Sequence, residues 1–284
     1  MPSADEIRED QRAVWDGLSA GWEKWDELIT RQLEPISAAM IDSLQPTPRA
    51  HHLDIASGTG EPGLRIARLV SEGTVTLTDL SPQMLAVAAR RAQAQGITNV
   101  KTRVCSADAL PFEDGEFDSV SVRLGYMFFP DAARVTAEIV RVLKKGGRVC
   151  SAVWVRPEQN PWTSIVMRAI AGEVPLPPPE PDRPSMFRCA APGQIGALYS
   201  AAGLDDVREW DVEVDLVTTS PQEYWDMMSE HVSLAVAALK QVDDAARERI
   251  RAAVVARARE FDRGAELHVP GMARCIAGTK QATH

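Results

Sequence analysis

The chain has 284 residues, enough for one large α/β domain with an insertion or for two modest domains. Its formal net charge of −9 argues against nucleic acid as a partner, because a phosphate backbone would be repelled unless the basic residues lay on one face. The polar N-terminus and the lack of an apolar run of about 20 residues predict a cytoplasmic enzyme without a membrane span.

Helical periodicity comes first along the chain. In residues 5–44, apolar side chains recur at steps of three and four, and Pro46 ends the segment. A strand at 53–56, a glycine turn and a helix at 63–70 follow. Strands and helices then alternate, over 74–80, 82–95, 100–105, 117–124, 132–143 and 148–155. This alternation predicts a parallel, doubly wound α/β sheet that binds ligands at the carboxyl ends of its strands.

The pattern changes after residue 155. A helix is expected at 161–173, a proline cluster at 174–184 and a second helix at 191–202. A strand at 207–217, a long helical stretch at 221–261 and a last strand at 267–277 follow. The expected organisation has four parts. They are an N-terminal helical lid at 1–48, a binding core at 49–155, connecting helices with a proline-rich loop at 156–206, and a sheet-completing segment at 207–284 with a helical insertion at about 221–262.

The stretch HLDIASGTGEPG places Gly58, Gly60 and Gly63 at the spacing G-x-G-x-x-G. A glycine loop that opens a helix can serve the pyrophosphate of a nicotinamide dinucleotide or the carboxylate and ribose of S-adenosylmethionine, so the glycines leave both open. Asp54, inside the strand before the glycine loop, favours S-adenosylmethionine. A nicotinamide-binding strand carries an apolar residue at this position, and a buried charge is costly unless it is paired. Asp54 could also be a buried, hydrogen-bonded carboxylate without a ligand.

Two further acids follow the next two strands. Asp79 ends the second strand and is placed to accept the ribose hydroxyls, although it could instead cap the next helix. Asp108 follows the third strand and is placed to accept the adenine amino group, with the Ala109 N–H facing a ring nitrogen. The three acids together favour S-adenosylmethionine over a nicotinamide cofactor.

The motifs LDIASGTG, LTDLSPQML, SADALPFEDGEFDSV, RLGYMFFPD and RVLKKGGRV occur in one characteristic order and spacing. Over residues 50–155 the chain resembles class I S-adenosylmethionine-dependent methyltransferases, and most of all the branch with the ubiquinone and menaquinone biosynthesis methyltransferases. The resemblance implies a Rossmann-like, seven-stranded sheet whose last strand is antiparallel. The helices between the sixth and seventh strands would then cover the substrate.

The resemblance also carries cofactor contacts over to matching positions. These are Asp54, Ala56, Ser57, Gly58, Gly60, Asp79, Leu80, Met84, Asp108, Ala109 and Arg123. Trp22 is added because N-terminal aromatic residues in this family close over the cofactor. Met84 could instead belong to the core and Arg123 to a surface ion pair. Ser57 stands where many relatives have cysteine, which matters little because the backbone does most of the binding there.

Methyl transfer is an in-line displacement that needs alignment and exclusion of water rather than a metal or a covalent nucleophile. No metal site is predicted, because the four cysteines lack ligand spacing. His231 is the first candidate for a general base, since imidazole titrates near neutrality, and Glu230 and Tyr126 are weaker ones. His231 could equally be a partly exposed helix histidine.

Aromatic and methionine side chains gather in three stretches expected near the carboxyl strand ends. They are Trp22, Trp25, Tyr126, Met127, Phe128, Phe129, Tyr224, Trp225, Met227 and Met228. Such a lining predicts methylation on oxygen or carbon of a small, largely apolar acceptor that is quinone-like, aromatic or polyketide-like. The alternatives are an NAD(P)-dependent oxidoreductase and a protein of this fold that keeps the cofactor for a non-methylating reaction or a binding role. The oligomeric state stays open, a homodimer included.

Overall fold

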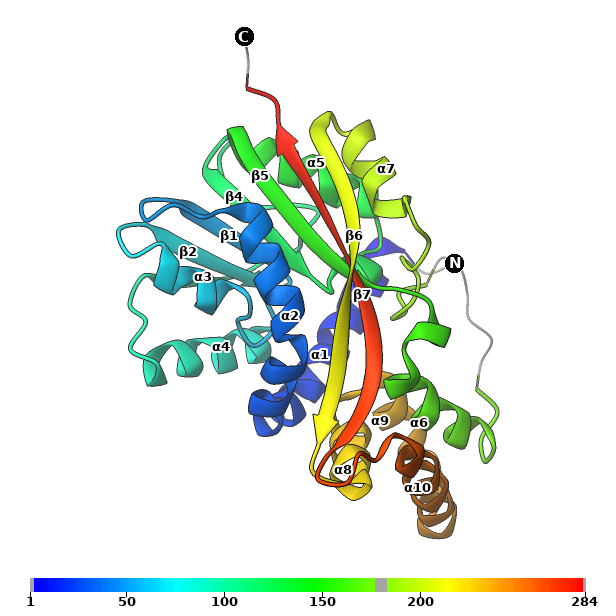
Figure 1. Cartoon of the computed structure of the whole chain (residues 1–284). Coiled ribbons are helices and arrows are strands. Elements are labelled where there is room, and N and C mark those ends of the chain that lie inside the picture. Colours follow the sequence, from blue (N-terminus) through cyan, green and yellow to red (C-terminus); the bar gives the residue numbers. More distant parts are fainter. Residues whose placement is uncertain (1–2, 177–182, 283–284) are drawn as a thin grey trace.

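The computed structural model describes residues 3–176 and 183–282 (Figure 1). Seven strands form one sheet in the order β3-β2-β1-β4-β5-β7-β6. They are β1 (His51–Ile55), β2 (Thr74–Asp79), β3 (Val100–Val104), β4 (Phe117–Arg123), β5 (Leu143–Trp154), β6 (Leu204–Thr218) and β7 (Leu267–Lys280). The first five pair in parallel, and β7 runs antiparallel to β5 and β6. The predicted Rossmann-like sheet with an antiparallel last strand is confirmed.

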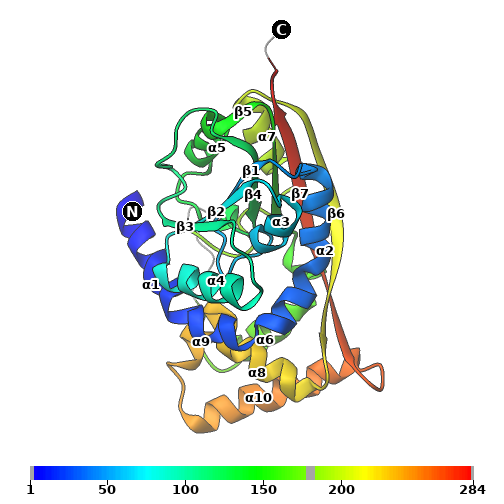
Figure 2. The ribbon, with the colours of Figure 1, turned by 90° about the vertical axis from the view of Figure 1, so that its left-hand side faces the viewer.

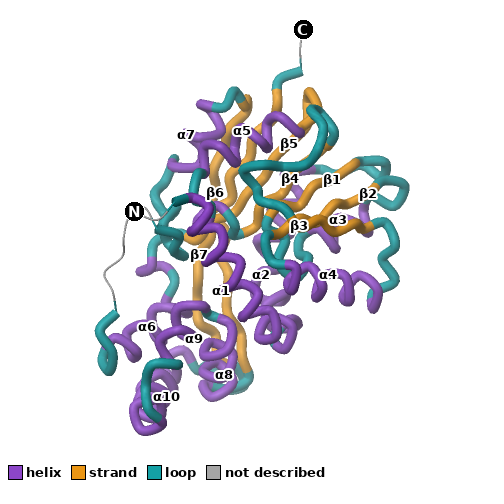
Figure 3. The backbone as a smooth tube through the Cα atoms, turned by 180° about the vertical axis from the view of Figure 1, so that it is seen from behind, coloured by secondary structure: helices purple, strands orange, loops and turns teal. Residues whose placement is uncertain are grey.

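Helices cover both faces of this sheet (Figures 2 and 3). One face carries α2 (Asp26–Leu44), α3 (Gly63–Leu69) and α4 (Pro82–Ala94), and the other carries α5 (Ala132–Val142) and α7 (Gln194–Ala201). The central strand β4 is therefore buried between two helical layers, with only Asp118 and Arg123 short of full burial, whereas the edge strand β3 is largely exposed.

A second group of helices gathers where β6 and β7 extend past the rest of the sheet (Figure 1). It consists of α6 (Pro161–Ala171), α8 (Pro221–His231), α9 (Ser233–Leu239) and α10 (Asp244–Ala258). The first helix, α1 (Ala4–Lys24), packs on α4 of the core and on α8 of this group. None of the helices in the described ranges combines the length and the apolar character needed to cross a bilayer.

Several element boundaries differ from those expected. The helical stretch 5–44 is two helices that meet at Trp25, and 221–261 is three helices and a short 3-10 turn at Arg259–Phe261. β6 begins at Leu204, so the expected boundary between 206 and 207 falls inside a strand. β5 begins at Leu143, because that residue pairs with Phe117 before a register shift. Most of the expected proline loop lies outside the described residues.

One buried histidine ties the two central strands together. His52 in β1 is fully buried, and its ring nitrogens lie 2.7 Å from the Ser119 hydroxyl and 2.8 Å from the Ser121 hydroxyl of β4. One ring nitrogen donates and the other accepts, so the neutral imidazole is satisfied. Burial lowers the pKa of His52 to about 3.

Acid should therefore destabilise the protein through His52. In the unfolded chain an imidazole titrates near pH 6.5, whereas the folded state holds it neutral, so the stabilisation is complete above about pH 6.5 and is lost as the pH falls. Between pH 7 and pH 5, the free energy of unfolding of the wild type should drop by about 2 kcal/mol more than that of His52→Gln. Urea denaturation at both pH values measures this. His51→Gln, at the exposed neighbouring position, is the control and should follow the wild type.

Candidate functional site

A cavity opens at the carboxyl ends of β1 to β5, where the strand order reverses between β1 and β4. Its walls come from α1, α2, the loops after these strands, α6 and the end of α8. This is the place at which doubly wound sheets bind ligands. Among the residues predicted for the site, the cavity is lined by Trp22, Ala56, Ser57, Gly58, Asp79, Leu80, Met84, Asp108, Arg123 and His231.

The glycine loop after β1 is held in shape by hydrogen bonds to its backbone. Ser57 N–H donates to the Thr78 carbonyl at 2.9 Å, and Gly58 N–H donates to Asp79 Oδ2 at 2.9 Å. Gly58 lies at φ 53° and Gly60 at φ 109°, a region that favours glycine. Gly60 does not line the cavity. Its N–H donates to the Ser57 carbonyl at 2.8 Å, so its role is to form the turn.

Asp54 supports this loop from behind. The side chain is fully buried and lies outside the cavity lining, with Oδ1 accepting from the Ser121 hydroxyl at 2.6 Å and Oδ2 from Gly63 N–H at 2.9 Å. Burial raises the pKa of Asp54 to about 7. The expected contact with the methionyl end therefore differs from the observed geometry, in which Asp54 anchors the loop.

Asp79 lies at the tip of β2 and faces the cavity. Its Oδ2 accepts from Gly58 N–H and its Oδ1 from Ser81 N–H, each at 2.9 Å. The N-cap of α4 is Ser81, whose hydroxyl accepts from Met84 N–H at 3.0 Å. Asp79 is thus not the helix cap, and burial raises its pKa because the carboxylate is partly removed from water.

Asp108 shares its carboxylate with the first helix. Oδ1 accepts from the Ser106 hydroxyl and Oδ2 from the guanidinium of Arg8 in α1, each at 2.5 Å. Ala109 does not line the cavity, and its N–H donates to the Ser106 carbonyl at 3.2 Å. The expected contact of this N–H with an adenine ring is therefore not supported, because the turn after β3 uses the donor internally.

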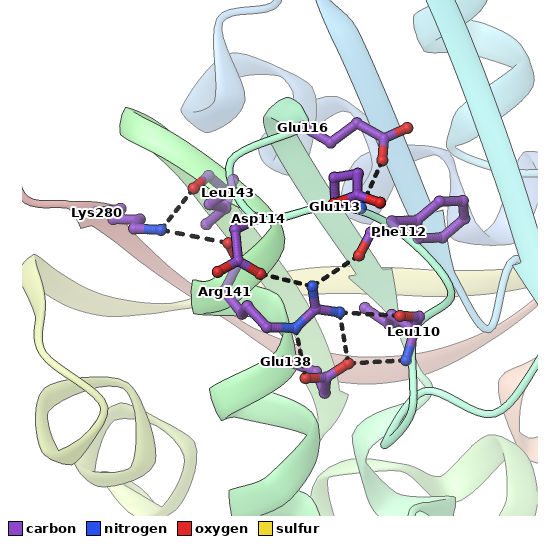
Figure 4. A network of polar contacts seen from close by, with 9 residues as sticks. All are labelled: Leu110, Phe112, Glu113, Asp114, Glu116, Glu138, Arg141, Leu143 and Lys280. Carbon is purple, nitrogen blue, oxygen red and sulfur yellow. Dashed lines mark hydrogen bonds and ion pairs between the residues drawn. The ribbon is translucent and has the colours of Figure 1, made fainter.

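The loop that carries Asp108 is fixed from outside the cavity by Arg141 of α5 (Figure 4). Its guanidinium donates to the Leu110 and Phe112 carbonyls at 2.9 and 2.7 Å and pairs with Glu138 and Asp114. Glu138 in turn accepts from Leu110 N–H at 2.8 Å. These carboxylates raise the pKa of Arg141, so the cation persists and the loop has a defined position.

Arg123, at the end of β4, lines the cavity and donates to the Ser37 hydroxyl at 3.1 Å. It is not a surface ion pair, and burial lowers its pKa. Met84 and Leu80 add apolar surface on the side of α4. The polar and apolar groups on this side of the cavity come from the ends of four neighbouring core strands.

Two of the candidate bases, Tyr126 and His231, have different surroundings. Tyr126 is fully buried outside the cavity, and its hydroxyl lies 3.0 Å from Thr136 Oγ1. Burial raises its pKa, and its position in the core, away from the cavity, contradicts the expectation that Tyr126 serves as a catalytic base. His231, the last residue of α8, lines the cavity and is 7% exposed. It is therefore a buried cavity residue and not a partly exposed helix histidine.

The aromatic lining is only partly the expected one. Trp22, Phe128 and Phe129 face the cavity, whereas seven of the expected residues belong to the core or the outer surface: Trp25, Tyr126, Met127, Tyr224, Trp225, Met227 and Met228. The sequence analysis did not identify four other residues that line the cavity, the aromatic Trp15, Trp154 and Trp162 and the polar Gln32. Trp15 lies one heptad before Trp22 on the same helix, and Trp154 ends a parallel strand, so both had a sequence signal.

Metal ligands do not gather at this site. Within residues 3–176 and 183–282, no group of three His, Cys, Asp or Glu side chains could hold a metal ion. The four cysteines are free thiols.

Comparisons with known proteins show which proteins the chain resembles. The chain is 42% identical over 110 residues to the ubiquinone/menaquinone biosynthesis C-methyltransferase UbiE of Marinomonas sp., a match covering 38% of this chain and 44% of that protein. It is 31% identical over 178 residues to the UbiE protein of Acidiphilium cryptum, covering 60% and 71%. The matched stretch spans less than half of the Marinomonas protein.

The fold is similar to that of the YcgJ protein of Bacillus subtilis, with a TM-score of 0.56 at 20% identity, covering 87% of this chain and 98% of that one. The model of the ubiE/COQ5 methyltransferase family matches residues 8–166, which is more than half of the chain and confirms the resemblance seen in the motifs. The chain therefore belongs to the ubiE/COQ5 methyltransferase family.

Proposed function

We propose that the protein transfers a methyl group from S-adenosylmethionine to an oxygen or carbon atom of a small, largely apolar acceptor. The observation that carries the proposal is the joint placement of the glycine loop, Asp79 and Asp108 on one wall of a cavity whose remaining walls are mostly apolar. Family membership and the relatives named as quinone-biosynthesis methyltransferases support it.

The residues present fit a bound cofactor. Ser57 Oγ and Gln32 Nε2 are buried polar atoms without a hydrogen-bond partner in the described part of the chain, and both residues line the cavity. Buried polar atoms rarely stay unpaired, so a polar ligand is expected beside them. Asp79 would hold the ribose, and Asp108 the adenine amino group once Arg8 yields part of the carboxylate.

When bound, the cofactor supplies a methyl group on a positively charged sulfur that leaves readily. The protein has to align the acceptor and keep water away. The loop from Ala56 to Gly58 fixes one end, while α1 and the end of α8 enclose the other. Arg123 adds a buried cation for an anionic group such as a carboxylate.

Titration calorimetry tests the proposal. Purified, ligand-free protein should bind both S-adenosylmethionine and S-adenosylhomocysteine saturably, with dissociation constants between about 1 μM and 1 mM, as is usual for enzyme substrates. NADH serves as the comparison ligand, since it tests the oxidoreductase alternative. Binding of NADH without binding of either adenosyl compound would overturn the proposal. A reaction that leaves S-adenosylmethionine intact would favour the non-methylating alternative.

A further inference from the structure

The cavity continues past the glycine loop into a chamber walled by aromatic rings. Trp15 of α1 meets Phe128 edge-on with ring centroids 5.1 Å apart, and Trp154 at the end of β5 lies 4.9 Å from Trp162 of α6. All four line the cavity. Aromatic side chains are favourable neighbours for a flat ring, because edge and face contacts add to the apolar area buried.

The position of Trp162 is fixed by its surroundings. Its Nε1–H donates to Asn160 Oδ1 at 3.0 Å, and the buried Asn160 amide donates in turn to the Met272 carbonyl at 3.1 Å. A Cβ on Gly271 would come within 2.7 Å of the indole, so only glycine leaves room for the ring there. This wall of the chamber is therefore preorganised.

His231 lines the same cavity and has a hydrogen-bond acceptor to offer. Its Nδ1 lies 2.8 Å from the Met227 carbonyl, so Nδ1–H donates and Nε2 keeps its lone pair. Burial lowers the pKa of His231 to about 4, which keeps the ring neutral near pH 7. The neighbouring Glu230 points to Lys24 and to the Trp25 indole N–H instead.

The aromatic ring that meets His231 edge-on carries a hydrogen-bond donor. The Trp22 ring is 5.9 Å from the His231 ring, and its Nε1–H is buried without a partner among the described residues. Gly21 lets α1 approach α8 closely, since a Cβ at this position would lie 2.4 Å from the Glu230 carbonyl oxygen. An unfilled donor next to an unfilled acceptor matches a hydroxyl group, which both donates and accepts.

The charge distribution restricts the acceptor further. In the described part of the chain, the charged cavity residues other than Arg8 come from the glycine loop and the core strand ends: Glu61, Asp79, Asp108 and Arg123. Arg8 is engaged with Asp108. The walls contributed by β5, α6 and α8 carry no formal charge, so the chamber suits a neutral ring.

We propose, on the basis of the function proposed above, that the acceptor is a neutral hydroxylated aromatic ring that is methylated on its oxygen. The hydroxyl donates to His231 Nε2 and accepts from Trp22 Nε1–H. In the reaction the oxygen–carbon bond forms as the carbon–sulfur bond breaks, and the hydroxyl proton passes to His231 Nε2 and then to water. The relatives are named as C-methyltransferases, but His231 lies outside the family match at 8–166. Their names therefore do not decide which acceptor atom lies beside His231.

Acceptor binding tests the hydroxyl site without any turnover. Calorimetry with saturating S-adenosylhomocysteine compares 2-naphthol with 2-methoxynaphthalene, which lacks the O–H group. We expect 2-naphthol to bind about tenfold more tightly to the wild type, the effect of one hydrogen bond to a buried acceptor. His231→Leu should abolish this preference, and His268→Leu on β7, away from the cavity, should retain it.

Two results would overturn the proposal in this experiment: equal affinities of the two compounds for the wild type, including no binding of either, or a preference that persists in His231→Leu. The dissociation constant of S-adenosylhomocysteine reports whether each variant folds. If His231→Leu fails to fold, His231→Gln takes its place, because its side-chain amide lacks the basicity to take a phenolic proton. It should then transfer methyl groups on the order of 100-fold more slowly.

The position of methylation gives a second readout. The probe 1,4-dihydroxynaphthalene offers both a hydroxyl and a ring carbon, and NMR of the product distinguishes a methyl ether from a ring-methylated compound. A methyl ether is the expected product. A ring-methylated product would contradict oxygen methylation and leave the proposed function intact, whereas failure to bind either adenosyl compound would contradict the proposed function itself.

Discussion

Asp79→Ala is expected to weaken S-adenosylmethionine binding on the order of 100-fold, the size of losing two charge-assisted hydrogen bonds. The carboxylate faces the cavity at the tip of β2, where it would accept the ribose hydroxyls, and it also holds Gly58 N–H and Ser81 N–H at 2.9 Å. The substitution therefore removes a ligand contact and loosens the glycine loop. Titration calorimetry on the purified variant measures the loss.

Asp79→Asn separates these two effects. The amide keeps one acceptor oxygen for the loop and loses the charge, so its binding should fall between those of the wild type and the alanine variant. Asp118→Asn is the matched control, because Asp118 lies at the start of β4, at the opposite end of the strand from the cavity, and pairs there with Lys144. Wild-type affinity in Asp79→Ala would remove Asp79 from the cofactor site.

Gly63→Ala is expected to lower both the stability and the cofactor affinity of the protein. A Cβ at this position would lie 2.3 Å from Leu77 Cδ2 and 2.8 Å from Asp54 Oδ2. Overpacking of this kind costs about 1–3 kcal/mol. Asp54 anchors the glycine loop by accepting a hydrogen bond from Gly63 N–H. Because the added methyl group displaces this contact, the affinity for S-adenosylmethionine should fall at least about tenfold.

Urea denaturation and calorimetry measure the two effects of Gly63→Ala. Gly17→Ala in α1 is the control, since a Cβ there meets nothing within 4 Å and alanine favours a helix by about 1 kcal/mol. The control should be at least as stable as the wild type. A Gly63→Ala protein that unfolds and binds like the wild type would show that the loop tolerates a shift of Asp54.

The sequence predicted the sheet well, because periodicity and turn residues act locally. The alternation of strands and helices predicted the parallel pairing, whereas the antiparallel β7 came from the resemblance, since pairing between distant strands leaves no local pattern. The strand-end acids were found through spacing alone, and two of the three, Asp79 and Asp108, line the cavity. Asp54 points behind the loop because its direction depends on Ser121, a residue of another strand.

The sequence does not predict which aromatic residues line the cavity. Tyr126 and Phe128 stand two positions apart in one 3-10 turn, yet Tyr126 packs against Thr136 while Phe128 faces the cavity. Which one faces inward is decided by α5 and α1, which pack on either side of the turn. The ion pair of Arg8 with Asp108 is also tertiary, as it joins residues 100 positions apart.

The first helix contributes to the enclosure rather than to the scaffold. Its Asp16 accepts a hydrogen bond from the Ser81 hydroxyl at the start of α4, and its Lys24 pairs with Glu230 near the end of α8. A chain shortened to begin at α2 would keep every strand pairing of the sheet. It would, however, uncover the cavity on the side of α1 and admit bulk solvent to the place where the proposed methyl transfer requires exclusion of water.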